Sequence, residues 1–337
     1  MLILGLDTSC DDTSAAVLED GRIVLSNIIQ SQVKLHQPHG GVVPELASRE
    51  HIRNIMHVAQ EALKTAQVKT EEIAAVAVTI GPGLIGSLLV GLYYAKGLAY
   101  GLGIPLVAVN HLEGHILSVF LEEDHPPFPF IILTVAGGHT SIYYVKDFGH
   151  YEQMGQTLDD AAGEAFDKVA KILGLGYPGG PVIERAAKKG DRERIKFPRA
   201  YLAKDSLDFS FSGLKTAVAL YVKEWEKGGK DVTLEDISAS FQEAVVDVLA
   251  DKLILAARKK GVRHVCMAGG VASNSRLRER LLEVTGANGL KAYWPRPAYC
   301  TDNGAMIALA GYHRFMRGEV ADLSIDVKSR FPIGQNA

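Results

Sequence analysis

The strongest clue to the fold of this chain is an order of predicted elements that occurs twice. Short apolar runs that end in turn residues predict strands, and Asp20-Gly21 between two such runs is typical of a hairpin. In the first half we expect strands at 2–6, 14–18 and 23–29, a helix at 48–65 with Ser48 as its N-cap, a strand at 74–80, a helix at 86–102 and a strand at 106–109.

The second half repeats this order after residue 129. We expect strands at 130–135, at 141–145 and from 151 onward, helices at 160–173 and 234–260, a strand at 264–267, a helix at 275–284, a strand at 291–294 and a helix at 303–315. Each half therefore has a meander of strands followed by helices that alternate with strands. Such a duplication favours an α/β protein made of two related halves.

This duplicated α/β unit resembles the actin/Hsp70/sugar-kinase (ASKHA, ribonuclease-H-like) fold. The resemblance implies two lobes with a central cleft, in which each lobe supplies a hairpin turn that can hold phosphate. We predict an N-terminal lobe at 1–128, a C-terminal lobe at 129–325 with an inserted basic helical segment at about 180–235, and a tail at 326–337. The order of elements predicts the fold alone, so the function must be argued from the site.

Composition excludes several classes of protein. With 36 Lys+Arg against 39 Asp+Glu in 337 residues, no basic field covers the surface, and any nucleic-acid contact must come from a local patch. Three well-separated cysteines exclude a disulfide scaffold. Residues 73–95 carry no charge, but Gly81-Pro82-Gly83 interrupts them, which favours a buried strand, turn and helix over a membrane span. We therefore expect a cytoplasmic protein without a membrane anchor.

Three turns rich in glycine or hydroxyl residues follow predicted strands, at 7–13, 136–140 and 268–275. Glycines let backbone N–H groups approach an anion, and the third turn opens a helix, whose N-terminus also favours negative charge. One such turn is a weak signal, whereas three in corresponding places are stronger. Asp7 is equally consistent with a turn that binds its own backbone. Asp11 lies beside Asp12, and two adjacent carboxylates favour a functional interpretation.

His111 and His115 are four residues apart, so on a helix both imidazoles point the same way and can reach one metal ion. Two polar histidines on a helix face are the simpler interpretation. The pair follows the strand expected at 106–109, however, and Asp302 in a late acidic turn could add a carboxylate. In the peptidase motif His-Glu-x-x-His the Glu follows the first His directly, whereas Glu113 comes two residues later, which disfavours proteolysis.

Basic residues are concentrated between Arg185 and Arg199 and again at Arg276, Arg278 and Arg280. Such runs are usually solvated faces, but in an acidic protein they are where a phosphate backbone would bind. Segment 196–215 interleaves Phe209 and Phe211 with hydroxyl residues and Lys215, so its aromatic rings could flank a base. The apolar helix expected at 86–102 is either core or a surface for a partner helix.

Together, these motifs closely resemble the TsaD family of bacterial tRNA threonylcarbamoyladenosine transferases. The matching segments are 40–49, 81–84, 111–115, 137–140, 159–168, 177–181, 208–215, 267–271 and 300–306. They span nearly the whole chain. Two positions depart from the family pattern: Ala136 stands where the family usually has Ser, and Asp12 stands where it usually has Glu.

The resemblance implies an acyl transfer from threonylcarbamoyl-AMP to the exocyclic N6 amine of the adenosine beside the anticodon of ANN-decoding tRNAs, with release of AMP. By position, His111, His115 and Asp302 would hold one metal ion, Fe or Zn, and Asp11 and His139 would lie near the chemistry. The nucleotide intermediate, or ATP or AMP in its place, would be bound by Thr134, Val135, Ala136, Gly137, Gly138, Asp167, Gly180 and Asn274.

The family also implies partners: tRNA, a smaller TsaB-like paralogue and a TsaE-like ATPase. The isolated chain could form a homodimer, and the sequence leaves this open. Three rival functions remain to be tested. A small-molecule kinase or ATPase of the same fold would use ATP alone and need neither tRNA nor the histidine pair. A non-catalytic scaffold would lack metal ligands, and a metallopeptidase is disfavoured by the position of Glu113.

Overall fold

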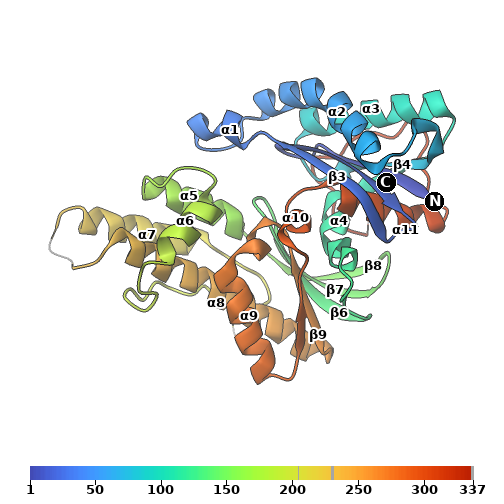
Figure 1. Ribbon diagram of the computed structural model, residues 1–337. Coiled ribbons are helices and arrows are strands. Elements are labelled where there is room, and N and C mark those ends of the chain that lie inside the picture. Colours follow the sequence, from blue (N-terminus) through green and yellow to red (C-terminus); the bar gives the residue numbers. More distant parts are fainter. Residues whose placement is uncertain (204, 229–230, 335–337) are drawn as a thin grey trace. The chain divides into compact units, whose positions relative to one another are not determined.

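A computed structural model describes residues 1–203, 205–228 and 231–334 (Figure 1). The chain divides into two compact units. The first contains Met1–His125, Phe148–His150 and the described residues from Pro295 onward, and the second contains the described residues of Pro126–Asp147 and Tyr151–Trp294.

The first unit is built on a five-stranded sheet with the strand order β3-β2-β1-β4-β5. The central strand β1 pairs antiparallel with β2 and parallel with β4. The strands are β1 (Leu2–Asp7), β2 (Asp12–Glu19), β3 (Ile23–Ser31), β4 (Ile73–Gly81) and β5 (Leu106–Asn110). The helices are α1 (Val33–His36), α2 (Pro44–Ala66), α3 (Ile85–Leu102), α4 (His111–Leu117), α10 (Pro297–Cys300) and α11 (Gly304–Met316), with 3-10 turns η1 (Gln37–His39), η2 (Thr70–Glu72) and η3 (Ser118–Leu121).

Helices cover both faces of this sheet, with α2 and α3 on one side and α11 on the other (Figure 1). Successive strand residues point to opposite faces. Leu4 accordingly packs in one core cluster with Leu92 of α3. Gly5 faces α11, and a Cβ there would lie 2.3 Å from the carbonyl oxygen of Gly304, so α11 can approach β1 because position 5 is glycine. Gly304 itself lies against the backbone of Ala15 and Ala16 in β2.

The second unit repeats this topology. Its sheet has the order β10-β9-β6-β7-β8, and its central strand β6 pairs antiparallel with β7 and parallel with β9. The strands are β6 (Phe130–Val135), β7 (Thr140–Asp147), β8 (His150–Gln156), β9 (His264–Ala268) and β10 (Lys291–Tyr293). The helices are α5 (Ala162–Ile172), α6 (Gly179–Ala187), α7 (Ser212–Trp225), α8 (Leu234–Lys260) and α9 (Ser275–Ala287), with the 3-10 turn η4 (Gly270–Ser273). The predicted duplication is confirmed.

Two local predictions were wrong. Helix α2 begins at Pro44, not at Ser48, because proline is well suited to the first helical position; Ser48 lies inside the helix and its hydroxyl donates to the Pro44 carbonyl. Phe209 and Phe211 cannot flank a base, because both rings are buried and stacked on each other. Phe209 also bridges to Thr157, which ties this segment into the second unit.

The chain divides differently from the expected lobes 1–128 and 129–325. Residues from Pro295 onward belong to the first unit because α11 packs on β1 and β2. The described part of the expected tail, 326–334, also packs there: Lys328 donates its amide to Ile80, and Phe331 is buried in the core. Residues 335–337 of that tail, and residues 204, 229 and 230 of the expected segment 180–235, lie outside the described residues.

The uncharged stretch 73–95 forms β4, the turn at Gly81–Gly83 and the first part of α3, as predicted. Most of β4 is buried between helices, which accounts for the lack of charge. Among the described residues, no helix combines the length and apolar character that a membrane crossing requires.

Candidate functional site

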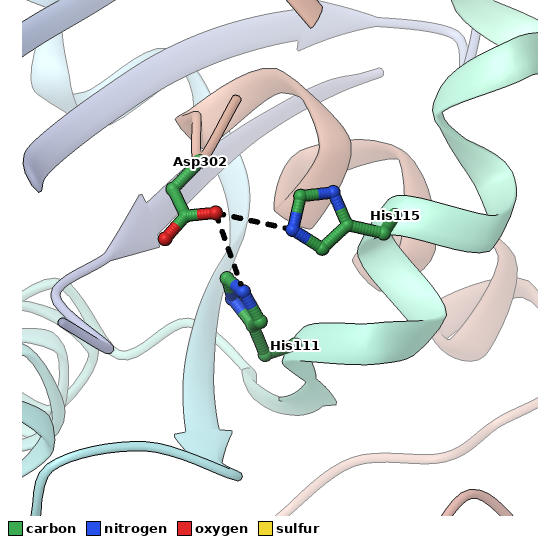
Figure 2. Close-up of side chains that lie close together, drawn as sticks. All are labelled: His111, His115 and Asp302. Atoms are coloured by element: carbon green, nitrogen blue, oxygen red, sulfur yellow. Dashed lines mark hydrogen bonds and ion pairs between the residues drawn. The ribbon is translucent and has the colours of Figure 1, made fainter. Parts of the chain in front are cut away.

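Two histidines and one aspartate of the first unit meet at a single point (Figure 2). Strand β5 ends at Asn110, whose side chain caps α4 by accepting from the Leu112 amide, so α4 starts with His111 and places His115 one turn later. Asp302 precedes α11, which Asn303 caps in the same way. Oδ1 of Asp302 lies 3.4 Å from Nε2 of His111 and 3.1 Å from Nε2 of His115.

The ring of His111 is held in one tautomer. Ser9 donates its hydroxyl proton to Asp7 over 3.2 Å and lies 3.1 Å from Nδ1 of His111, which is 3.4 Å from Asp7 itself. A hydroxyl whose proton is already committed accepts at its other side, so Nδ1 keeps its proton, and Nε2 offers a lone pair to a metal once its own proton has left. A carboxylate behind a histidine in this way is typical of metal-ligating imidazoles.

Charge at this cluster favours a cation. Burial lowers the pKa of His111, but the carboxylates of Asp302 and Asp7 outweigh burial and hold that pKa well above its ordinary value. Burial raises the pKa of Asp302, but His111 and His115 outweigh it and hold that pKa well below its usual range. Oδ1 of Asp7 is buried without a hydrogen-bond partner among the described residues. The cluster thus attracts positive charge.

The cluster fits a metal ion. Two imidazole nitrogens and one carboxylate oxygen lie within 4.8 Å of one another, and all three side chains are largely withdrawn from solvent. Two nitrogen ligands and one oxygen ligand leave coordination positions open, as catalytic sites require. The predicted ligand set His111, His115 and Asp302 could therefore hold a metal.

Glu113, between the two histidines on α4, points elsewhere. Its side chain is 2% exposed and its Oε2 lies 2.7 Å from Nε of Arg314 on α11. A glutamate engaged in a buried ion pair is not available as the general base of a metallopeptidase. The ion pair of Glu113 with Arg314 therefore agrees with the sequence argument against a peptidase.

Asp11 lies in the turn between β1 and β2, the same turn that carries Asp7 and Ser9. Burial raises the pKa of Asp11, and the charge of Asp302 raises it further. Burial likewise raises the pKa of Asp12 to about 7. His139 occupies the corresponding turn of the second unit, between β6 and β7, where its carbonyl accepts from the Ala136 amide.

The predicted anion-binding turn of the second unit is built at the end of β6. The carbonyls of Ala136 and Gly137 accept from the first amides of α5, and a Cβ on either Gly137 or Gly138 would meet nothing within 4 Å. Gly269, after β9, lies against Val135 so closely that a Cβ would be 2.4 Å from the Val135 oxygen. The backbone of Gly269 therefore lies beside the backbone of residues 134–138 at the end of β6.

Asp167, Gly180 and Asn274 lie at helix starts in the same unit. Oδ1 of Asp167 accepts from the Gly179 amide at 2.6 Å, which fixes the start of α6 where Gly180 lies. Asn274 caps α9, and its Nδ2 donates to Gln242 at 2.8 Å. Beside it a cavity of ≈ 230 Å³ is lined by Gln242, Glu184 and other residues of α6, α8 and α9.

Sequence reasoning missed several residues around these sites. Ser9, Glu184, Gln242 and His51 are single polar residues without a motif, and the role of Asp7 was left open. Apart from Ser9, which lies within the turn predicted to bind an anion, no sequence signal pointed to them, because each acts through partners that only the fold brings near. The second expected basic cluster is largely neutralised: Arg276 pairs with Glu243 and Glu283, and Arg280 pairs with Asp247, among others.

Solved structures with a similar fold define the class. Component A of (R)-2-hydroxyglutaryl-CoA dehydratase from Acidaminococcus fermentans has a TM-score of 0.55 and 18% identity over 93% of this chain and 98% of its own. HypF of T. kodakarensis has a TM-score of 0.64 and 15% identity over 94% of this chain and 48% of its own. At this identity the likeness shows the fold alone: the duplicated α/β fold of the actin/Hsp70/sugar-kinase class.

Sequence relatives are much closer. A protein of Thermodesulfovibrio yellowstonii called tRNA N6-adenosine threonylcarbamoyltransferase is 54% identical over 336 residues, covering 99% of this chain and 100% of its own. One of the same name from Clostridioides difficile is 50% identical over 99% of each chain. The profile of the TsaD family, described as tRNA N6-adenosine threonylcarbamoyltransferase, matches residues 23–309. This chain belongs to the TsaD family, and the predicted resemblance is confirmed.

Proposed function

We propose that this chain transfers the threonylcarbamoyl group of threonylcarbamoyl-AMP to the N6 amine of the adenosine 3′ of the anticodon in ANN-decoding tRNAs and releases AMP. The observation that carries the proposal is similarity to transferases of this name over 99% of the chain, at about half of all positions. A fold neighbour alone would not distinguish this activity from that of a kinase, since one fold hosts many functions. Because tRNA is the acceptor, we also propose a cytoplasmic location.

The reaction needs positioning more than activation. The amine nitrogen forms a bond to the carbamoyl carbon, the bond from that carbon to the AMP oxygen breaks, and the amine loses a proton. AMP is a good leaving group, so most of the barrier comes from orienting a weak nucleophile and stabilising the developing oxyanion. A divalent ion, Fe or Zn, held by His111, His115 and Asp302 would supply positive charge to that oxyanion.

Asp11 and His139 are the side chains that we assign to proton transfer. Burial raises the pKa of Asp11, which makes its carboxylate a better proton acceptor than an exposed aspartate. His139 belongs to the turn whose neighbouring amides, at Gly137 and Gly138, would face the nucleotide phosphate. Which of the two side chains takes the amine proton follows from the separate pH profiles of Asp11→Asn and His139→Gln.

The remaining predicted residues would bind the nucleotide. Backbone of Thr134, Val135, Ala136, Gly137 and Gly138 would surround the phosphate, with the amides of Gly137 and Gly138 as donors, and loss of the usual hydroxyl at Ala136 leaves these two donors intact. Asp167 and Gly180 lie at the start of α6, and Asn274 at the start of α9 beside the cavity of ≈ 230 Å³. Asn274 already uses Oδ1 and one N–H within the protein, so one amide N–H is left for a ligand.

The test is reconstitution with unmodified ANN-decoding tRNA, threonine, bicarbonate, ATP, a synthase that makes the adenylate, and the partner proteins. Modified nucleoside should appear with the wild type, and His111→Ala should abolish it together with bound metal. His150→Ala replaces an exposed histidine and is the matched control, which should leave both unchanged. Absence of product with the wild type rejects the transferase, and full activity of His111→Ala rejects the role of the metal.

We propose that tRNA phosphates bind the exposed run between Arg185 and Lys196. Among the described residues, Lys188 and Arg194 pair with acids here, whereas Lys189 and Arg192 are exposed and form no ion pair. The double variant Lys189→Glu/Arg192→Glu should weaken tRNA binding and lower the slope of log affinity against log salt by about 2. Arg22→Glu/Arg263→Glu makes the same change in net charge elsewhere on the surface and should alter the slope far less.

We propose that a TsaB-like paralogue covers the outer face of α2 and α3, and that a TsaE-like ATPase joins this pair; in isolation the same face would form a homodimer. The inner face of α3 packs in the core, while Tyr93 and Tyr100 are 62% and 77% exposed, and Ile52 of α2 is 65% exposed. Tyr93→Glu should abolish co-purification with the paralogue. Leu220→Glu, at an exposed position of α7, is the matched control, and equal loss in both variants would contradict the assignment.

A further inference from the structure

His51 of α2 joins both ends of the turn that carries Asp11. Its Nε2 lies 3.0 Å from the carbonyl oxygen of Cys10, and its Nδ1 lies 2.7 Å from Oγ1 of Thr13. The ring is fully buried. The two contacts are made from a helix 38 residues away from Thr13 in sequence, so they are tertiary contacts of the turn rather than part of its local geometry.

The chemistry of the two partners fixes the proton on this ring. A carbonyl oxygen only accepts, so Nε2 of His51 must donate its N–H to Cys10. Burial lowers the pKa of His51, which favours the neutral ring. Nδ1 of a neutral ring that carries its proton on Nε2 is an acceptor, and the Thr13 hydroxyl donates to it. Both hydrogen bonds are therefore satisfied at the same time by one neutral tautomer.

The rest of the turn is held from other elements. The carbonyl of Ser9 accepts from the Leu84 amide at 2.8 Å, and the hydroxyl of Thr8 donates to the Ser87 carbonyl of α3. The carbonyl of Asp11 accepts from the Gln32 amide at 3.0 Å. Residues 8 and 9 are thus fixed by the β4–α3 segment, and Thr13 pairs with Gln30 of β3. His51 adds the side-chain link that ties Cys10 to Thr13 across Asp11.

We propose that His51 is a positioning residue for the transfer reaction, which it serves by clamping Cys10 to Thr13 so that Asp11 is held in one place beside Asp302. This inference rests on the proposed function, because it gives Asp11 its role. His51 itself does not contact the substrate or the metal: both ring nitrogens are used inside the first unit, and the ligand cluster found among the described residues is His111, His115 and Asp302.

The clamp can be removed from either end. His51→Leu deletes both hydrogen bonds, whereas His51→Gln keeps an amide donor and a carbonyl acceptor on a flexible side chain. Thr13→Val deletes the hydroxyl at nearly constant volume, and Thr13→Ser keeps it. Ile55→Ala is the matched control, because Ile55 is a buried residue of the same helix that packs in the apolar core. This substitution should lower the melting temperature without releasing the turn.

We expect His51→Leu to lower kcat about 10- to 100-fold with KM for tRNA and metal content unchanged, since a small displacement of a reacting group costs rate rather than binding. His51→Gln and Thr13→Ser should recover part of the rate. Ile55→Ala should keep its kcat at temperatures where it is folded. A kcat of His51→Leu equal to that of Ile55→Ala overturns the proposal.

A second readout does not depend on activity. The Gln32 amide donates to the Asp11 carbonyl, so its hydrogen exchange reports whether the turn is fixed. Exchange of this amide should be faster in His51→Leu and Thr13→Val than in wild type and in Ile55→Ala. Unchanged exchange in these two variants contradicts the clamp, whatever their activity. If exchange is faster in the variants but the wild-type protein makes no product, the proposed function is rejected and the clamp is retained.

Discussion

The carboxylate of Asp7 is expected to control how tightly the cluster of His111, His115 and Asp302 binds a metal ion. Asp7→Asn preserves the size of the side chain and an oxygen that can accept from Nδ1 of His111, but removes the negative charge behind the ring. Ser9 lies 3.1 Å from the same nitrogen and remains as an acceptor, so the tautomer of His111 should be unchanged. What is lost is the basicity that the carboxylate gives to Nε2.

The magnitude follows from this arrangement. Loss of such a partner typically lowers metal affinity about 10- to 100-fold. Because the 3.4 Å contact of Asp7 is longer than that of Ser9, we expect a loss near the lower limit, about tenfold or about 1.4 kcal/mol. In Asp7→Asn/Ser9→Ala both acceptors are weakened or absent, and the loss should approach about 100-fold, or about 2.7 kcal/mol.

The assay is competition for Zn²⁺ with a coloured chelator at fixed pH, with the melting temperature measured beside it to confirm folding. Asp302→Asn removes a direct ligand and should lose more affinity than either variant. Asp20→Asn changes an exposed carboxylate that pairs with the N-terminus, so it should bind as the wild type does. Wild-type affinity in Asp7→Asn, or a loss as large as that of Asp302→Asn, would refute the reasoning.

Three further outcomes are expected from the packing and charge of the two units. Arg314→Met removes the ion pair of buried Glu113 and should lower the free energy of unfolding in urea by about 3–5 kcal/mol, while the added change Glu113→Gln should restore part of it. Gly269→Ala should lower the melting temperature sharply, because residue 269 has φ +96° and lies against Val135. Gly137→Ala has free space around its new methyl group and should change the free energy of unfolding by less than about 0.5 kcal/mol. Equal effects of the two substitutions would contradict this. Burial raises the pKa of Asp12 to about 7, so the folded state keeps a proton there that the unfolded chain has lost. The contribution of Asp12 to stability should therefore fall as pH rises from about 4 to 7, and the stability of Asp12→Asn relative to wild type in urea titrations should rise over the same range.

The element order and the candidate metal-binding residues could be predicted because local sequence patterns indicate them. Apolar runs and turn residues determine the strands of both sheets, and the spacing of His111 and His115 determines that both lie on one helix face. Asp302 was a candidate because it lies in an acidic turn before a helix, and the family resemblance joined it to the two histidines. These features need no knowledge of which elements touch.

The errors and omissions share a different origin. The clamp at His51 and the role of Asp7 depend on contacts between segments far apart in sequence, which no local pattern encodes. The placement of α11 was missed because the repeat suggested that each half folds by itself. In the structure, Gly5 near the start of the chain contacts Gly304 at the start of α11. Phe209 was misassigned because burial, not aromatic character, decides whether a ring is available to stack on a base.

The close contact between Gly5 and α11 has a consequence for biosynthesis. The ribosome synthesises β1 first and the helix that covers it some three hundred residues later. One face of the sheet of the first unit therefore stays uncovered while the second unit is synthesised. Asp302 precedes that same helix, so a nascent chain cannot complete the His111, His115 and Asp302 cluster before synthesis is nearly finished. A prematurely terminated chain would therefore expose an apolar sheet and lack the complete cluster.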